Sequence, residues 1–335
     1  DRRLGVPRGK TLGGSSSINS MVYIRGRASD YDAWADLGCA DWDWQSVLHY
    51  FKRSEKNLRI ENDLHGQEGP LIVGDLPSPH PLCRKWIEAG EAVGIPHNDD
   101  FNGETQEGLG VFQVTMKKGR RWSSADAYLG GAAGRDNLTV LTDAEAQKIE
   151  FRDSRATGIT ILHNGSPRTI KVRQELLLSA GAIGSPALLL ASGVGPESDI
   201  DELGIPLINK LDGVGANLQE HVSIGISAVA KAGRGLSLAT LPSIGWSPFQ
   251  YLLTGKGLMS TNHVEAGGFA RTNDSLAEPD VQFHMIPARV GVESKGIVWG
   301  RGYFADACLL QPESRGRLTI AKNGAGFTPL IDFDA

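Results

Sequence analysis

A leucine run that leads into a glycine turn constrains the fold of this 335-residue chain more than any other feature. Leu176-Leu177-Leu178 is a continuous apolar run, which suits a strand buried on both faces of a sheet. It continues into Ser179-Ala180-Gly181, after which Ser185 is a favourable N-cap and Pro186 a favourable first helical residue. A strand, a glycine turn and a capped helix in this order are typical of a doubly wound α/β sheet, which binds ligands at the carboxyl ends of its strands.

The other apolar patterns divide the chain into a helical beginning and a strand-rich remainder. Three- and four-residue spacing predicts helices over 29–56, 82–93 and 246–254. Short runs between turns predict strands in the middle of the chain, and longer alternating runs predict antiparallel strands after residue 221. The predicted strands cover 138–141, 148–151, 156–162, 169–172 and 175–178, and then 224–230, 265–271, 281–286, 305–310 and 316–320. The fold class is therefore α/β with mixed α+β character.

Composition excludes several functional classes. Lys and Arg total 34 and Asp and Glu total 39, so the net charge of −5 excludes a strongly basic nucleic-acid-binding protein. The three cysteines lie far apart and the eight histidines form no His-Glu-x-x-His pair, so no metal site is predicted. No apolar run approaches the roughly 18 residues of a transmembrane helix. We expect a cytoplasmic protein and leave a peripheral membrane location open.

Residues 8–21 read Arg-Gly-Lys-Thr-Leu-Gly-Gly-Ser-Ser-Ser-Ile-Asn-Ser-Met. Paired glycines such as Gly13-Gly14 remove side chains where a backbone must lie against a flat or charged group. This pattern fits a cofactor cradle, and it also fits a flexible Gly/Ser loop. The sequence contains no complete Gly-x-Gly-x-x-Gly fingerprint after a strand and no Gly-x-Ser-x-Gly elbow, so neither a pyrophosphate-binding turn nor a hydrolase is indicated.

Taken together, the motifs resemble the glucose-methanol-choline (GMC) family of flavin-dependent alcohol oxidoreductases. The stretch from Gly9 to Asp32 is similar to the first signature of that family, and Ser179 to Gly195 is similar to the second. Further similar stretches follow in the order of the family: 66–71, 100–103, 121–129, 138–144, 213–221 and 312–317. Residues 262–269 and 309–317 resemble bacterial choline and alcohol dehydrogenases more closely than fungal sugar oxidases.

This resemblance implies FAD as cofactor. By family position, the backbone of Ala146 would meet the adenine, and Ala180-Gly181 would close over the dinucleotide. The residues that would lie along the flavin and its pyrophosphate are Leu12, Gly13, Gly14, Ser15, Asn19, Met21 and Val22. Some relatives attach the flavin covalently through a histidine just before the asparagine of the first signature. That position is Ile18 here, so we predict noncovalent FAD.

Two parts of the family pattern are not found in this sequence. The glycine fingerprint unit would precede Asp1, and the histidine that acts as general base would follow residue 335. We therefore expect an internal fragment that has no activity of its own, no assignable catalytic residue, and poor solubility because its parallel sheet has an unpaired edge. His263, Glu265 and His284 are the candidates for lining the substrate side.

The resemblance also implies a division of the chain and a function. Residues 1–66 and 120–222 would form an incomplete Rossmann-like FAD-binding domain, and residues 67–119 and 223–335 a substrate-binding domain with a mainly antiparallel sheet. The expected reaction oxidises a small-molecule alcohol to an aldehyde and passes the electrons to a quinone or another acceptor. No residue indicates which alcohol is used.

Three alternatives remain open. A GMC alcohol oxidase would use dioxygen as acceptor, and a noncatalytic module would keep the fold without binding flavin. An NAD-dependent dehydrogenase would require a complete glycine fingerprint and an acidic residue after the second strand.

Overall fold

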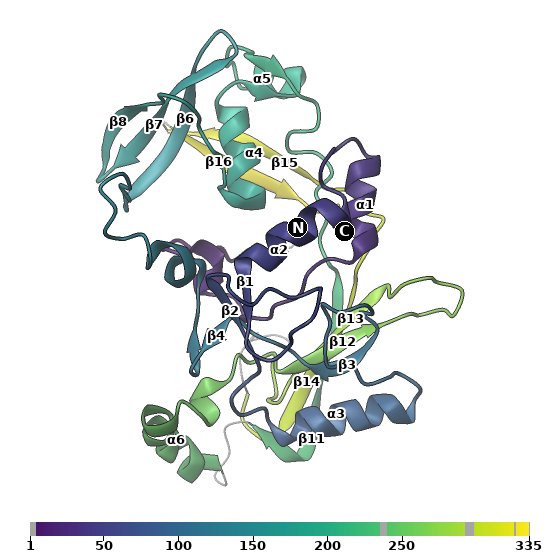
Figure 1. The fold of residues 1–335 in the computed structure, drawn as a ribbon. Coiled ribbons are helices and arrows are strands. Elements are labelled where there is room, and N and C mark those ends of the chain that lie inside the picture. The colour runs from purple at the N-terminus through teal and green to yellow at the C-terminus, as the bar shows by residue number, and fades with distance from the viewer. Residues whose placement is uncertain (1–4, 235–239, 292–297, 325, 335) are drawn as a thin grey trace. The chain divides into compact units, whose positions relative to one another are not determined.

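The structure is a computed structural model that describes residues 5–234, 240–291, 298–324 and 326–334 (Figure 1). The chain forms two compact units. Unit 1 comprises residues 1–138 and 223–310, and unit 2 comprises residues 139–222 and 311–335. The functional division expected from the sequence has other boundaries and stays a prediction.

The main sheet of unit 1 is antiparallel, and its described strands follow the order β11-β14-β13-β12-β3. The strands are β3 (Gly108–Val111), β11 (Ser223–Arg234), β12 (Ala266–Ala270), β13 (Val281–Ile286) and β14 (Gly302–Leu309). The predicted strands over 224–230, 265–271, 281–286 and 305–310 and their antiparallel pairing are thereby confirmed. Helix α3 (Pro81–Ala92) covers one face, where Cys83 packs with Ala266 and Met285.

The helical region predicted over 29–56 contains two helices, with a break that the sequence analysis did not locate. Helix α1 (Ala28–Asp36) ends before Gly38, whose φ is 99°, and Asp41 has a φ of 66°. Residues with these left-handed conformations cannot continue a right-handed helix. Helix α2 (Trp44–Ser54) then begins after Asp43, whose side chain accepts a hydrogen bond from the Ser46 N–H group.

The aromatic residues of these two helices pack together. The ring centroid of Tyr31 lies 5.3 Å from that of Trp34, 5.7 Å from that of Trp44 and 5.5 Å from that of Phe51. Such distances are typical of aromatic packing, so these rings form a local core. The predicted helices at 82–93 and 246–254 are also confirmed, the second as α6 (Leu241–Thr254).

Short elements complete unit 1. They are β1 (Glu55–Asn57) and β2 (Leu71–Val73), which pair in parallel, β4 (Met116–Lys117) and β5 (Arg120–Arg121), which form a hairpin, the 3-10 helices η1 (Gly14–Ser17) and η4 (Leu258–Ser260), and the π-helix η2 (Ala125–Leu129). Among the described residues, no helix has both the length and the apolar character that crossing a bilayer requires.

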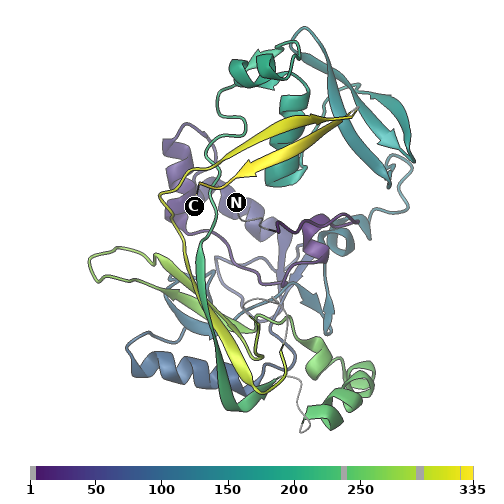
Figure 2. The same cartoon turned by 180° about the vertical axis from the view of Figure 1, so that it is seen from behind.

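Unit 2 is built around helix α4 (Gly181–Ala191), which packs against a meander and a hairpin (Figure 2). The remaining elements are β6 (Ala144–Arg152), β7 (Arg155–His163) and β8 (Ser166–Lys171) of the meander, β15 (Arg317–Asn323) and β16 (Gly326–Asp332) of the hairpin, the pair β9 (Val194–Gly195) and β10 (Asn209–Lys210), and α5 (Glu197–Glu202). Leu190, Ile200 and Leu318 form its core. The predicted strands at 148–151, 156–162, 169–172 and 316–320 correspond to β6, β7, β8 and β15.

Two predicted strands, including the one expected to be buried in a parallel sheet, are not formed among the described residues. Residues 138–141 and 175–178 pair with no strand among the described residues, and Leu177 is 81% exposed. A strand buried on both faces requires hydrogen-bonding neighbours, and the described chain supplies none at these positions.

The predicted start of helix α4 also needs correction. The helix begins at Gly181, so Pro186 lies inside it and Ser185 is not its N-cap. The Ser185 hydroxyl instead accepts a hydrogen bond from the Ala180 N–H group, at 3.0 Å.

Candidate functional site

The Gly/Ser-rich segment at residues 9–21, called the cradle loop below, has a defined conformation that requires glycine. Gly13 has a φ of 85°, in the left-handed region that side chains rarely adopt. A Cβ atom there would overlap the Ser17 hydroxyl, and a Cβ atom on Gly9 would overlap the backbone of Gly14. The structure therefore shows an ordered turn in this segment and not the flexible Gly/Ser loop that the sequence left open.

Hydroxyl groups hold the cradle loop to the segment around Ser124. The Ser16 hydroxyl donates to the Gly13 carbonyl at 2.6 Å and accepts from the Ser124 N–H group at 2.9 Å. The Ser124 hydroxyl donates to the same carbonyl at 3.1 Å. The two bonds from Ser124 join parts of the chain more than 100 residues apart, and all three bonds fix the turn at Gly13.

Arg121 and Asn262 fix the second half of the cradle loop. One guanidinium nitrogen of Arg121 donates to the Ser16 carbonyl at 2.9 Å and to Asn19 Oδ1 at 2.8 Å, and the other donates to the Asn19 carbonyl at 2.7 Å. The Asn262 amide, which is 1% exposed, donates to the Ser20 carbonyl at 2.8 Å. The bonds from the Arg121 guanidinium are charge-assisted and therefore among the stronger ones in proteins, so they hold the backbone in place.

The outer side of the cradle loop is open. Leu12, Ser15 and Asn19 are exposed, Ile18 is 53% exposed, and nothing lies within 4 Å of where a Gly14 side chain would begin. Bare backbone of this kind can contact a flat ring or a pyrophosphate group. The cradle loop is thus anchored on one side and open on the other.

Met21 and Val22, the last two of the residues expected to lie along the flavin, are more buried than the others. The Met21 side chain is 7% exposed and packs with Leu76, Val114 and Met116. Val22 is half-buried and forms a β-bridge with Val114. Their contact with a cofactor stays a prediction, as it does for the other first-signature residues.

The expected adenine-side residues lie in unit 2. Ala146 is an exposed residue of β6 at a register shift between Ala146 and Lys148, and Ala180-Gly181 forms the start of α4. Gly181 has a φ of 80° and open space where a side chain would lie. Because these residues and the cradle loop belong to different units, their convergence on one cofactor stays a prediction.

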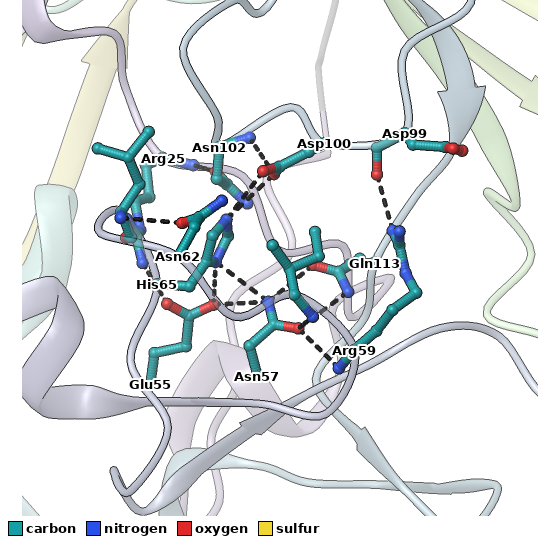
Figure 3. A network of polar contacts seen from close by, with 12 residues as sticks. Arg25, Glu55, Asn57, Arg59, Asn62, His65, Asp99, Asp100, Asn102 and Gln113 are labelled. Atoms are coloured by element: carbon teal, nitrogen blue, oxygen red, sulfur yellow. Dashed lines mark hydrogen bonds and ion pairs between the residues drawn. The ribbon is translucent and has the colours of Figure 1, made fainter.

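Buried charged and polar side chains form a network that includes Arg25, four residues after the end of the cradle loop (Figure 3). Glu55 is fully buried, forms an ion pair with Arg25, and accepts a hydrogen bond from Asn57 at 2.9 Å. His65 lies between two carboxylates, with Nδ1 2.9 Å from Glu55 Oε1 and Nε2 3.0 Å from Asp100 Oδ2. Two cations thus face two carboxylates, and the network, called the charge network below, is balanced.

The charge network determines the protonation state of His65. Burial by itself disfavours the imidazolium, but the hydrogen bonds and charges of Asp100 and Glu55 outweigh it and raise the pKa of His65 to about 9. Burial also disfavours the charged carboxylates, yet bonds from His65 hold the pKa values of Glu55 and Asp100 below their usual range. His65 is therefore an imidazolium at neutral pH with both nitrogens donating.

The charge network anchors the chain immediately after the cradle loop. The backbone N–H group of Arg25 donates to Asn102 Oδ1 at 2.7 Å, and the side-chain amide of Asn102 donates to the Tyr23 carbonyl at 3.1 Å. The Tyr23 N–H group donates to the Gln113 carbonyl at 2.9 Å. His65 is 2% exposed and both its nitrogens are occupied, so the arrangement serves structure and cannot exchange protons with a substrate.

The three candidate residues for the substrate side have different surroundings. Glu265 is fully buried and accepts hydrogen bonds from the His80 N–H group and the Thr261 hydroxyl. His263 is exposed. His284 is half-buried on β13, and its Nδ1 lies 2.8 Å from Asp306 Oδ1 on β14. Their substrate-side roles stay predictions.

Comparisons with known proteins decide the family. The GMC oxidoreductase model, named GMC_oxred_N, matches residues 1–223. The chain belongs to the GMC oxidoreductase family. Over 99% of its length it is 40% identical to "Alcohol dehydrogenase [acceptor]" from Pseudomonas putida, of which it covers 61%. It is also 40% identical to "Oxygen-dependent choline dehydrogenase" from Pectobacterium carotovorum subsp. carotovorum, of which it covers 60%.

A solved structure supports the same fold. Pyridoxine 4-oxidase from Mesorbium loti aligns with a TM-score of 0.83 and 28% identity, covering 97% of this GMC chain and 61% of the other. The α/β fold class and the resemblance to bacterial choline and alcohol dehydrogenases are confirmed. The GMC chain spans about 60% of the length of the curated relatives it matches.

Sequence reasoning did not identify the residues that support the cradle loop. Arg121, Ser124 and Asn262 each lie within a stretch that resembles the family, which was the available signal. Their partners lie more than 100 residues away in the sequence, so no local pattern links donor to acceptor.

Proposed function

We propose that this chain is part of a GMC enzyme that oxidises a small-molecule alcohol to an aldehyde with FAD. The cradle loop carries the proposal, because it combines an open outer backbone with an inner side fixed by Ser124 and Arg121. The names of the alcohol and choline dehydrogenase relatives support an alcohol as the substrate class.

The residues present fit the proposed cofactor. Gly14 leaves backbone accessible to a flat ring, and the exposed Leu12, Ser15 and Asn19 would lie along it. Ala146 and Ala180-Gly181 would hold the adenine end. Ile18 carries no imidazole that could form a covalent bond to the flavin, so we expect FAD to be held noncovalently.

FAD, when bound, supplies the acceptor for the hydride that leaves the alcohol carbon. The residues of this chain orient the cofactor, and a loop fixed before binding lowers the cost of that orientation. A base with a pKa near neutrality must take the hydroxyl proton. The family resemblance implies that this base is a histidine beyond residue 335, so we expect residues 1–335 alone to be inactive.

We infer a quinone or a similar acceptor, in line with the name of the Pseudomonas putida relative. A dioxygen-using oxidase is the second candidate, which the pyridoxine 4-oxidase likeness favours. We place the protein in the cytoplasm, peripheral to the membrane in which quinones dissolve.

The absorbance spectrum of the full-length protein tests this function. We expect flavin bands that an alcohol bleaches under anaerobic conditions, and denaturation should release the flavin into the supernatant. Rapid return of colour with dioxygen but not with quinone would favour the oxidase. A colourless protein would contradict the proposal and favour a noncatalytic module.

A further inference from the structure

Helix α6 turns its large apolar side chains away from unit 1. The exposed fractions of Leu241, Trp246, Phe249, Leu252 and Leu253 are 48%, 60%, 60%, 75% and 79%. At 100° per residue, all five lie within about 140° of the helix circumference. The rings of Trp246 and Phe249 stack, with centroids 5.9 Å apart. The helix therefore carries a continuous apolar stripe on its outer side.

The inner side of α6 is mainly polar, with the half-buried Ile244 as its aliphatic residue. Ser247 is 2% exposed, and Gln250 and Tyr251 are half-buried. The Tyr251 hydroxyl donates to the Gly119 carbonyl at 3.1 Å, which fixes the helix to the turn of the β4–β5 hairpin. The orientation is thus the reverse of that expected for a helix of a water-soluble domain, which buries its apolar side.

Helix α3 in the same unit has the usual orientation. Its Cys83 is buried against the main sheet, while Arg84 and Glu88 form an exposed ion pair. The reversal is therefore a property of α6 and not of unit 1 as a whole. An exposed apolar stripe of this size marks a surface that contacts an apolar partner.

The charge around α6 indicates which partner. Residues 222–264 contain three Lys or Arg residues and no Asp or Glu. Lys231 and Lys256 are exposed, and Lys256 directly follows the Gly255 residue that ends the helix. Exposed aromatic and leucine side chains flanked by lysine are typical of helices that lie in the interface of an anionic membrane.

We propose that α6 docks this protein on an anionic lipid surface. The 14 residues of the helix span about 21 Å, less than the hydrocarbon core of about 30 Å, so the helix would lie along the membrane surface and not cross the membrane. Trp246, Phe249, Leu252 and Leu253 would enter the headgroup–acyl boundary, and Lys256 would meet anionic headgroups.

The β4–β5 hairpin links this surface to the cradle loop. Gly119 in its turn accepts the bond from Tyr251 of α6, and Arg121 at its end bonds to Asn19 of the cradle loop. A helix docked on lipid would therefore bring the cradle loop near the membrane, where a lipid-soluble quinone could take up electrons. This consequence rests on the proposed function, whereas the docking itself does not.

Vesicle flotation of the full-length protein tests the docking. The probes are vesicles of phosphatidylglycerol with phosphatidylethanolamine and vesicles of phosphatidylcholine alone. We expect binding to the anionic vesicles that W246S/F249S weakens at least tenfold, and that Lys256→Glu weakens on anionic vesicles only. The matched control is L37S/V93S, which removes two exposed apolar side chains outside α6 and should bind like the wild type.

Further outcomes would overturn the inference. These are no flotation of the wild type, or equal flotation of W246S/F249S and the control when circular dichroism shows both to be folded. Sedimentation gives a third outcome: a wild-type dimer that W246S/F249S dissociates, with no vesicle binding, would show that the stripe contacts a second copy. Because no readout involves activity, failure here leaves the flavin proposal intact, and a colourless protein would leave the docking intact.

Discussion

The charge network and the cradle loop are neighbouring parts of unit 1 that use polar groups in opposite ways. In the charge network, Glu55, His65 and Arg25 are all buried and each charge meets an opposite one. In the cradle loop, polar contacts occupy only the inner side, and the outer backbone is left open. Segment 21–25 connects the two.

This difference separates the charge network, which we expect to stabilise the fold, from the cradle loop, which we propose binds FAD. A buried charge that loses its partner destabilises the folded state, so removal of any one charged group of the charge network should lower the free energy of unfolding. An open backbone held from behind costs little stability and presents fixed groups to a ligand. Changes to the charge network should therefore affect unfolding, and changes to the cradle loop should affect FAD binding.

Glu55→Gln should have the largest effect of the changes considered. It keeps the shape of the side chain but removes one of the two carboxylates. Arg25 and His65 are then left with Asp100 as the remaining carboxylate of the charge network. We expect the free energy of unfolding to fall by about 3–5 kcal/mol in urea denaturation. The control is Glu61→Gln, which alters an exposed carboxylate. Equal free energies of unfolding of the two variants would contradict the stabilising role of the charge network.

The pH dependence of unfolding should show the contribution of His65. The pKa of His65 is about 9 in the folded protein and about 6.5 when unfolded. The contribution of His65 to the free energy of unfolding, on the order of 3 kcal/mol, is therefore complete below pH 6.5 and is lost as the pH rises through 9. His65→Gln should lack this decline. An identical decline in the variant would assign it to other groups.

Arg121→Ala should weaken FAD binding more than folding. The change removes three hydrogen bonds to the cradle loop, so we expect the Kd for FAD to rise about tenfold, or about 1.4 kcal/mol. The free energy of unfolding should change by less than about 1 kcal/mol, because an exposed loop opens locally. Titration of apo-protein with FAD measures the first and urea denaturation the second.

Arg120→Ala is the matched control for this variant, because Arg120 is the exposed neighbour in the same strand. It should change neither quantity. If Arg121→Ala lowered stability as much as Glu55→Gln while leaving the affinity for FAD unchanged, the two regions would not have separate roles.

Local patterns predicted the elements whose stability is local. Alternation identified β11 to β14, because each strand pairs with others in the same unit. The strand predicted at 175–178 failed, because a fully buried strand depends on neighbours that the described residues do not provide. The position of the break at Gly38 between α1 and α2 was not located, because apolar residues at three- and four-residue spacing occur on both sides of it.

The sequence identified the cradle loop as the candidate site but not the residues that support it, and the contact of the cradle loop with FAD stays a prediction. The glycine pair at residues 13–14 identified the cradle loop, whereas the bonds from Arg121 and Asn262 depend on tertiary contacts. The charge network was hidden for the same reason, since His65 and Asp100 meet only after folding. Its histidine appeared in the sequence as an isolated residue.

Hydrogen–deuterium exchange of the full-length protein with and without FAD tests the central claim most directly. That claim is that the cradle loop of unit 1 and Ala180-Gly181 of unit 2 hold one flavin. We predict that FAD slows exchange in both segments, at residues 12–19 and at 180–182, and leaves the amides around His65 unchanged. Protection confined to one segment, or absent from both, would contradict the account.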